Sequence, residues 1–169
     1  MRRVILYSGG LDSYLMYRYA CFLGSSDTVT NVWYDIGQPY NFKERQAIQA
    51  LGLPVDIKQV DWLSESNRAS GKEGSASGDI YIPGRNLVLA SLAACQYTPD
   101  EVWLGALEGE IHDRATDKNF QFRDKASELL SYVLSPFVPS VRLSFPFAEQ
   151  HWSKLDIVRL ALSEWGVLS

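Results

Sequence analysis

The sequence predicts an α/β fold in which an open, mainly parallel sheet of five strands carries helices on both faces. Short apolar runs alternate along the chain with longer segments whose apolar residues recur at a helical spacing, as in successive βα units. The first apolar run, residues 4–7, is continuous, which indicates a strand buried on both faces. The 169 residues show no internal repeat and fit a single domain over 1–169.

Glycines and polar segments mark where the elements end. Gly24 and Gly52 each follow a helical pattern and suit the backbone that closes many helices. Residues 62–78 are rich in Ser, Gly, Glu and Asn, so we expect a long surface loop there, a candidate lid. Residues 108–119 are polar and predict a second loop. The expected strands are 4–7, 29–34, 55–60, 101–105 and 141–143, and the expected helices are 13–23, 41–51, 86–97, 120–134 and 153–165.

Composition narrows the class of protein and its partners. The net charge is -4 without a basic stripe, so direct nucleic-acid binding is not expected. Cys21 and Cys95 lie in apolar helical segments, and we expect inert core thiols there, with neither a disulfide nor a zinc site. No apolar stretch approaches the roughly 20 residues that span a bilayer, and the run after Arg3 is too short for a signal peptide. We therefore expect a cytoplasmic protein without a membrane partner.

A glycine-rich motif lies between the first strand and the first helix: Ser8-Gly9-Gly10-Leu11-Asp12-Ser13. Its two glycines let the backbone turn tightly and bring N–H groups near an anion, and the helix adds its positive N-terminal end. Ser8 and Ser13 can donate hydrogen bonds to phosphate oxygens. Asp12 suits such a site only if a cation stands between it and the phosphate, so we assign it to Mg²⁺. A plain turn with a serine or aspartate N-cap is the simpler alternative, but the complete motif favours phosphate binding.

The motif resembles the SGGxDS signature of the PP-loop ATP pyrophosphatases, whose fold is adenine nucleotide alpha hydrolase-like and Rossmann-like. Two further segments are similar to those of one family in this class, the 7-cyano-7-deazaguanine synthases (QueC). They are Tyr34-Asp35-Ile36-Gly37-Gln38-Pro39-Tyr40 with Lys43-Glu44 and Ala47, and Tyr81-Ile82-Pro83-Gly84-Arg85-Asn86. All three segments occur in the family's order and at about its spacing, and the resemblance is clear from residue 3 to about residue 97.

The resemblance implies an ATP-dependent C–N ligase of deazaguanine, or queuosine-type, biosynthesis. Enzymes of this family use ATP, Mg²⁺ and ammonia to convert the carboxylate of 7-carboxy-7-deazaguanine into a nitrile, through an adenylated intermediate and an amide. The resemblance also implies a small deazapurine substrate, a tendency to form homodimers, and a bacterial or phage-infected host cytoplasm.

The chain departs from this family in two ways. The family carries a four-cysteine zinc cluster after its last helix, whereas this sequence stops at Ser169, so zinc is not expected. The family's acidic, cysteine-bearing substrate segment is not recognisable near 119–123. Three alternatives stay open: a shortened, phage-type member that stops at the amide, another PP-loop enzyme such as a tRNA thiolase or one acting on a different carboxylate, and a non-catalytic ATP-binding module.

Several residues of these segments are candidates for the site. Arg85 opens a helix and can pair with a phosphate or a substrate carboxylate. Lys43 lies on the second helix, where an exposed charged face is the simpler interpretation, and the backbone around Tyr34 suits adenine binding at the end of a strand. The predicted catalytic residues are Asp12, Arg85 and Lys43. The predicted cofactor-binding residues are Ser8, Gly9, Gly10, Leu11, Asp12, Ser13, Tyr34, Gln38 and Arg85.

Weaker candidates follow the fourth strand and precede the last helix. The polar cluster after the fourth strand consists of Glu108, Glu110, His112 and Asp113. His112 is the candidate for proton transfer, although a solvated loop explains the cluster nearly as well. His151 looks like a helix-start residue. Lys154 reaches a phosphate only if the last helix packs near the glycine-rich motif, and a surface lysine is the simpler interpretation.

Overall fold

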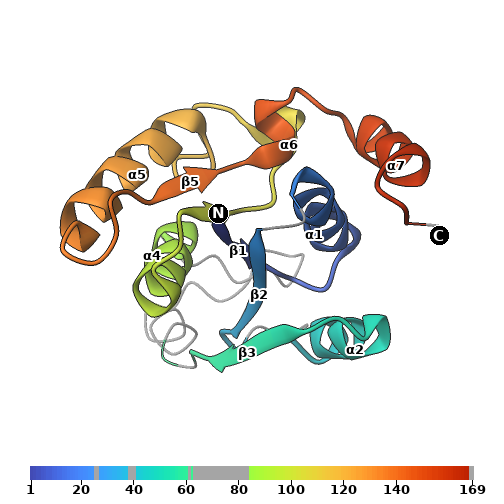
Figure 1. The fold of residues 1–169 in the computed structure, drawn as a ribbon, viewed down its shortest axis with the longest axis horizontal. Coiled ribbons are helices and arrows are strands. Elements are labelled where there is room, and N and C mark those ends of the chain that lie inside the picture. The colour runs from blue at the N-terminus through green and yellow to red at the C-terminus, as the bar shows by residue number, and fades with distance from the viewer. Residues whose placement is uncertain (25–26, 38–40, 61, 63–83, 168–169) are drawn as a thin grey trace.

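The computed structural model describes residues 1–24, 27–37, 41–60, 62 and 84–167. These residues form a five-stranded sheet in the order β3-β2-β1-β4-β5, with helices on both of its faces (Figure 1). Each pair of neighbouring strands is parallel. The α/β class and the five strands expected from the sequence are therefore confirmed.

The central strand of the sheet is the first one in the chain. Val4 of this strand pairs with Thr30 on one side and with Val102 on the other. The chain passes first to one side of β1 and later returns to its other side, so the strand order reverses there. In open parallel sheets, ligands bind beyond the carboxyl ends of the strands at such a point. The strands are β1 (Arg2–Leu6), β2 (Thr28–Asp35), β3 (Val55–Gln59), β4 (Glu101–Trp103) and β5 (Arg142–Ser144).

Helices cover both faces of the sheet. α1 and α7 pack together over one face, and α4 and α5 pack together over the other (Figure 1). The α-helices are α1 (Leu11–Leu23), α2 (Asn41–Leu51), α4 (Arg85–Tyr97), α5 (Phe120–Leu134), α6 (Pro146–Glu149) and α7 (Lys154–Ser163), and a 3₁₀ turn, η1, spans Glu108–Glu110.

The expected elements begin and end within two residues of the observed ones. Two short elements, η1 and α6, are missing from the prediction because a single turn is too short to show an apolar period. Gly24 is the C-cap of α1, as expected, and its backbone is extended with φ of -169°, whereas Gly52 has φ of +62°. The loop predicted over 62–78 lies outside the described residues except for Trp62, whose side chain is exposed.

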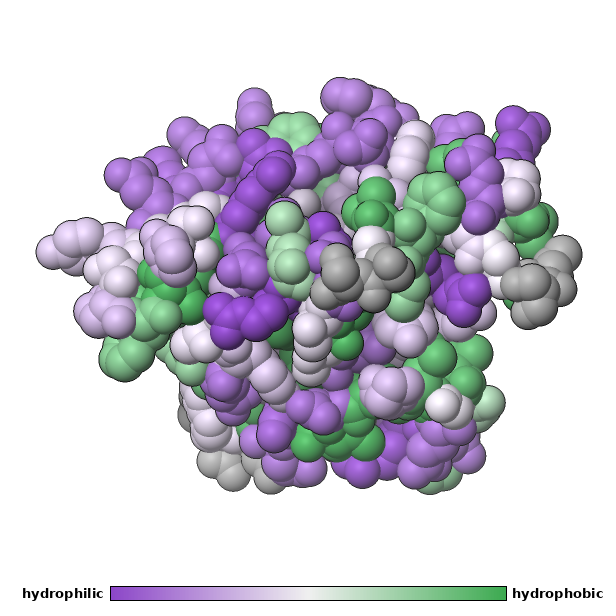
Figure 2. Space-filling view, in the orientation of Figure 1, coloured by the Kyte–Doolittle hydropathy of each residue, from purple (hydrophilic) through white to green (hydrophobic). Residues whose placement is uncertain are grey.

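The two cysteines are exposed, which corrects the prediction that both lie in the core. The buried side of α1 includes Met16 and Ala20, and that of α4 includes Ala90 and Ala94. Successive residues of a helix point about 100° apart, so the residue after Ala20 or Ala94 turns toward solvent. Figure 2 shows hydrophobic side chains scattered among hydrophilic ones over the surface, as on most soluble domains.

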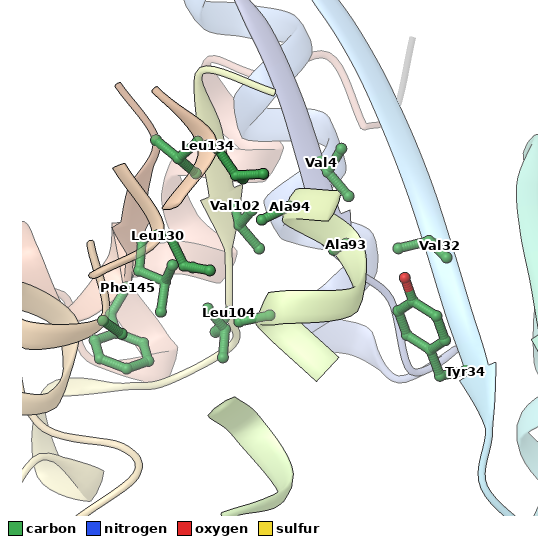
Figure 3. Close-up of a cluster of buried hydrophobic side chains, with 14 of the residues drawn as sticks. Val4, Val32, Tyr34, Ala93, Ala94, Val102, Leu104, Leu130, Leu134 and Phe145 are labelled. Carbon is green, nitrogen blue, oxygen red and sulfur yellow. The ribbon is translucent and has the colours of Figure 1, made fainter. Parts of the chain in front are cut away.

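Each strand sends alternate side chains to opposite faces, and this produces two apolar clusters. Val4, Val32 and Val102 join the cluster under α4 and α5, whereas their neighbours Ile5 and Trp33 join the cluster under α1 and α7. The small side chains of α4 lie against β1, β2 and β4 in Figure 3, and three buried alanines of this helix are 0% exposed. α4 therefore approaches the sheet closely, with its first turn near the carboxyl ends of the strands.

Candidate functional site

The glycine-rich motif forms the connection between β1 and α1. The backbone N–H of Ser8 donates a hydrogen bond to Ser13 Oγ at 3.0 Å, and the two hydroxyl oxygens lie 2.8 Å apart. Ser13 is buried, so it anchors the loop to the helix, whereas Ser8 is exposed toward solvent. The two serines thus differ: Ser13 anchors the loop from the buried side of α1, and Ser8 lies at the surface.

The two glycines of the motif differ in what they require. Gly9 has φ of +77°, and a Cβ placed there would lie 2.9 Å from the backbone oxygen of Glu44 and 3.1 Å from Ile48. Glycine at this position therefore lets α2 pack directly against the loop. At Gly10 a Cβ would meet only the Ser8 hydroxyl at 3.6 Å, an ordinary contact. Space alone therefore does not require glycine at position 10.

The N-terminus of α1 opens toward the same space. Its N-cap is Gly10, which has no side chain to accept hydrogen bonds from the first turn. The first N–H groups of a helix lack intrahelical partners and carry the positive end of its dipole. The loop and this helix start together provide N–H donors and a positive field for an anion.

A cavity of about 330 Å³ lies at the carboxyl ends of the central strands. This volume lies within the usual range for small-molecule sites, roughly 300–1,000 Å³. The cavity opens where the strand order reverses at β1, in agreement with the location expected for an open parallel sheet. The lining residues come from β1 and α1 (Leu6, Tyr7, Ser8, Asp12, Ser13), β2 and α2 (Val32, Trp33, Tyr34, Ile36, Glu44), α4 (Arg85, Asn86, Leu89) and the segment after β4 (Leu104, Gly105, Glu110, Lys118).

Lys154 brings a positive charge to the glycine-rich motif. Its Nζ donates a hydrogen bond to Asp12 Oδ1, and the side chains are 46% and 40% exposed. Ser153 is the N-cap of α7, and its hydroxyl and backbone N–H exchange hydrogen bonds with Asp156. This capping box fixes Lys154 at the first position of the helix. The packing of the last helix near the motif, on which a phosphate role of Lys154 depended, is thus observed.

A second ion pair lies at the cavity wall, between Lys118 and Glu110. Lys118 Nζ lies 2.7 Å from Glu110 Oε1, and the Leu107 N–H donates to the other carboxylate oxygen at 2.8 Å. Burial disfavours the charge on Glu110, but these two hydrogen bonds outweigh burial and, with the nearby charge of Lys154, lower its pKa. Glu110 is therefore an anion at neutral pH.

The side chain of Arg85 lines the cavity, and its guanidinium makes no ion pair or hydrogen bond with any residue in the described ranges 1–24, 27–37, 41–60, 62 and 84–167. Its neighbour Asn86 donates from Nδ2 to the Asp117 carbonyl at 3.0 Å, which ties the start of α4 to the segment that carries Lys118. Gly84 precedes Arg85 with φ of +66°. The guanidinium is therefore held at the cavity while its donors stay open to a ligand.

The wall of the cavity at β2 is made of anchored side chains. Trp33 Nε1 donates to Glu44 Oε2 at 3.0 Å, and the Tyr34 hydroxyl donates to Gln96 Oε1 at 2.8 Å. Burial, with the charge of Asp56 nearby, raises the pKa of Tyr34, so its hydroxyl stays protonated. These side chains fix the end of β2, whose backbone was the predicted adenine contact.

Asp35 is a buried carboxylate just behind this wall, with 2% of its surface exposed. Its Oδ1 accepts from Gly37 N–H at 3.0 Å and from Asn41 at 3.1 Å. Its Oδ2 accepts from Arg45 at 3.0 Å and more weakly from Gln59 at 3.4 Å. Burial opposes the charge, but the hydrogen bonds and Arg45 outweigh it and lower the pKa of Asp35. The residue joins β2, β3 and α2 beneath the cavity.

The predicted site residues are distributed unequally about this cavity. Five of them line it: Ser8, Asp12, Ser13, Tyr34 and Arg85. Gly9 and Gly10 shape the loop beside it. Leu11 is 53% exposed, Lys43 is exposed on α2, and neither lines the cavity. Gln38 lies outside the described residues.

The weaker candidates also differ in whether they line the cavity. Glu110 lines the cavity, whereas His112 and Asp113 are exposed and do not. His151 Nδ1 lies 2.9 Å from Glu108 Oε1, outside the cavity, and both side chains are mostly exposed. Within the described ranges, no three His, Cys, Asp or Glu side chains are grouped closely enough to hold a metal. Likewise, no described helix is long and apolar enough to cross a membrane.

Lys118 is a cavity residue that the sequence did not single out, and Trp33 was considered only for its backbone, beside Tyr34, as an adenine contact. A lysine in a polar loop resembles any solvated charge, and a tryptophan in an apolar strand resembles core. Lys118 is brought to the cavity in part by the hydrogen bond from Asn86, at the start of α4, to the carbonyl of Asp117. That contact depends on the tertiary fold and cannot be read from spacing.

Comparisons with known proteins identify the fold and no family. No protein-family model matches the sequence, and no curated protein matches it. A solved structure described as a predicted subunit of tRNA methyltransferase from Methanocaldococcus jannaschii is similar, with a TM-score of 0.62 and 16% identity. The match covers 96% of this chain and 74% of that one.

A second similar structure is the U34-tRNA thiolase NcsA from Methanococcus maripaludis with its [4Fe-4S] cluster. It has a TM-score of 0.60 and 12% identity, and the match covers 96% of this chain but 56% of that one. This chain therefore spans little more than half of the thiolase chain. Together the two likenesses show the fold alone, an open parallel α/β fold of the Rossmann-like kind expected from the sequence.

Proposed function

We propose that this protein binds ATP in the cavity beside the glycine-rich motif and cleaves it to AMP and pyrophosphate, as a PP-loop ATP pyrophosphatase. The observation that carries the proposal is the placement of Arg85. An arginine held at a cavity without a partner among the described residues faces a loop and a helix start that both favour anions. A polyphosphate matches this combination of charge and N–H donors.

Three positively charged side chains surround the proposed phosphate site. Arg85 and Lys118 line the cavity, and Lys154 reaches Asp12 at its edge. Charge builds on the bridging oxygen of the leaving pyrophosphate as the α,β bond breaks, and cations fixed nearby stabilise it. Ser8 and the N–H groups after Gly9 are neutral donors, and they bind the phosphate oxygens through hydrogen bonds.

The residues at the cavity fit a magnesium ion that is shared with the nucleotide. Mg²⁺ in such sites takes one or two carboxylates and completes its shell with phosphate oxygens and water. Asp12 is the carboxylate in place for this, and it already binds a cation, the ammonium of Lys154. When bound, Mg²⁺ would neutralise charge on the departing pyrophosphate.

We further propose that the group activated by ATP is a carboxylate, with 7-carboxy-7-deazaguanine as the substrate. The support is the similarity of residues 34–47 and 81–86 to the deazaguanine synthase segments, together with cavity positions for Tyr34, Glu44 and Arg85. A carboxylate oxygen attacks the α-phosphorus, and pyrophosphate leaves with the bonding electrons. Ammonia then adds to the carbonyl carbon, AMP leaves, and loss of a proton gives the amide.

Conversion of the amide into the nitrile requires that a second ATP activate the amide oxygen. The amide oxygen attacks the α-phosphorus of another ATP, and pyrophosphate leaves again. AMP then leaves together with the former amide oxygen. The nitrogen loses two protons, and a C≡N bond remains. Two ATP molecules are thus consumed for each nitrile and one for each amide.

The test is incubation with ATP, Mg²⁺, ammonium and 7-carboxy-7-deazaguanine, followed by mass spectrometry of all products. We expect AMP and pyrophosphate with amide or nitrile, and their loss in Asp12→Ala. Asp113→Ala is the matched control, because this exposed aspartate does not line the cavity. AMP and pyrophosphate that form only with another carboxylate would replace the substrate proposal. ATP binding without AMP, from folded protein, would contradict the catalytic proposal and favour an ATP-binding module.

A further inference from the structure

The hydroxyl groups of Ser8 and Ser13 form a short chain of hydrogen bonds. Ser13 Oγ accepts the backbone N–H of Ser8 at 3.0 Å, and it lies 2.8 Å from Ser8 Oγ, where either oxygen could be the donor. Each hydroxyl has one proton to donate and two lone pairs that accept. The direction of the contact between the two hydroxyls therefore follows from the other partners that each of them has.

The burial of Ser13 determines this direction. Ser13 is 4% exposed, and Ser8 Oγ is the one acceptor that its hydroxyl contacts within the part of the chain that the structure describes. If Ser8 donated to Ser13, the proton of Ser13 would be buried without an acceptor, which is costly. Ser13 therefore donates to Ser8. The proton of Ser8 is then free, and Ser8 is an exposed residue that lines the cavity.

We propose that Ser13 is a positioning residue that directs the hydroxyl proton of Ser8 toward a ligand oxygen in the cavity. The proposal rests on the proposed binding of ATP phosphates beside the loop. It differs from the expectation that both serines donate to phosphate, because Ser13 spends its proton on Ser8 and acts on the ligand through Ser8 alone. A hydroxyl that accepts one hydrogen bond is a stronger donor in the next one, since linked hydrogen bonds polarise each other.

The same arrangement also assigns the backbone donors of the loop. The N–H of Ser8 is bonded to Ser13 Oγ, so it is not available to a phosphate. The ligand is left with the Ser8 hydroxyl and with the N–H groups that follow it in the loop and at the start of α1. Ser13 thus holds both the backbone and the side chain of Ser8 in the orientation that binding requires.

The first test is a double-mutant cycle with pyrophosphate as the ligand, measured by isothermal titration calorimetry. The dissociation constant should rise about tenfold or more in Ser8→Ala, the effect of one hydrogen bond to a charged group. It should rise at least about threefold in Ser13→Ala, because Ser8 loses its orientation. In the Ser8→Ala background, Ser13→Ala should change it by less than about twofold. Effects that multiply would mean that Ser13 binds phosphate directly or only shapes the loop, and would overturn the proposal.

Ser127 of α5 is the matched control for a merely structural effect. Its Oγ accepts the Leu143 N–H at 2.9 Å and donates to the Arg123 carbonyl at 2.7 Å, and it does not line the cavity. Ser127→Ala loses the same kinds of bond and should leave the pyrophosphate affinity unchanged, whereas an equal loss of affinity would overturn the proposal. Ser13→Cys keeps nearly the same side-chain size with a weak donor, and it replaces Ser13→Ala if that variant does not fold.

A wild-type protein that binds no pyrophosphate would overturn the ATP proposal together with this one, so the second test uses no ligand. In a mixture of light and heavy water, a slowly exchanging hydroxyl splits the NMR signal of its serine Cβ by an isotope shift, and a rapidly exchanging one averages it. The buried, bonded proton of Ser13 should give a split signal and the free proton of Ser8 an averaged one. An averaged signal for Ser13 would overturn the proposed direction and leave the ATP proposal standing.

Discussion

The ammonium of Lys154 binds the carboxylate of Asp12, and this contact joins the first turns of α7 and α1 across 142 positions of the chain. Both side chains are nearly half exposed, so solvent screens the pair and it contributes less than about 1 kcal/mol to stability. Its value is the position that it gives the ammonium, next to the loop that we propose for the phosphates. A nucleotide arriving with Mg²⁺ would share Asp12 with the metal and Lys154 with a phosphate.

Replacing Lys154 should weaken the binding of phosphate ligands and leave the stability of the fold unchanged. Lys154→Met should unfold at nearly the wild-type temperature, because the lost ion pair is exposed. Its affinity for ATP or pyrophosphate should fall about tenfold or more, the effect of removing one hydrogen bond to a charged group. Isothermal titration calorimetry with each ligand measures this. Lys125→Met, an exposed lysine of α5, is the control, and equal affinities in the two variants would refute the role of Lys154.

Replacing Gly9 of the loop should cost more stability than replacing Gly52, which has a similar backbone but open space around it. Gly9→Ala should lower the free energy of unfolding by more than about 2 kcal/mol, because a left-handed backbone and a close contact with the Glu44 oxygen both oppose the new Cβ. Gly52→Ala has a similar φ of +62° but nothing within 4 Å of its Cβ, so it should cost only about 1 kcal/mol. Urea denaturation of both variants measures the difference, and similar losses would mean that α2 does not restrict Gly9.

Gly10→Ala completes this set of variants. Its Cβ meets only an ordinary contact at 3.6 Å, so the free energy of unfolding should fall by no more than about 1 kcal/mol, the cost of alanine at an N-cap. Affinity for ATP should nevertheless fall, because the added methyl group stands where the loop N–H groups approach the phosphates. Unchanged ATP affinity in Gly10→Ala would place the phosphates away from this part of the loop.

Asp35 predicts how stability depends on pH. Its pKa is lowered in the folded protein, so the ionised form stabilises the fold above the unfolded pKa, near 4. This contribution is lost as the pH falls through the lower, folded value. Asp35→Asn should therefore lose about 2 kcal/mol at neutral pH, and the difference from wild type should shrink below about pH 4. Urea midpoints between pH 7 and pH 3 measure it. A difference that stays constant with pH would contradict this assignment.

The glycine-rich loop and the parallel sheet could be predicted because their signals lie in residues that are neighbours in the sequence. The apolar run into Ser8-Gly9-Gly10 and the helical period after it are both readable from neighbouring residues. Lys154 and Lys118 depend instead on how α7 and the segment after η1 pack, and an isolated lysine has no signal in the sequence. The exposed cysteines were misplaced for a related reason, because an apolar helix of this kind does not show which of its residues face the core.

Arg85 provides the last prediction, because its guanidinium has no partner within the described chain. Removing it should cost no stability, so Arg85→Gln should melt at the wild-type temperature without ligand. Pyrophosphate should raise the melting temperature of the wild type, since a ligand that binds only the folded state stabilises it, and this rise should nearly vanish in Arg85→Gln. Arg85→Lys keeps the charge but loses the planar, two-donor geometry, so it should recover only part of the rise. Full recovery by lysine would mean that Arg85 acts as a point charge, and an unchanged rise in Arg85→Gln would place the anion elsewhere.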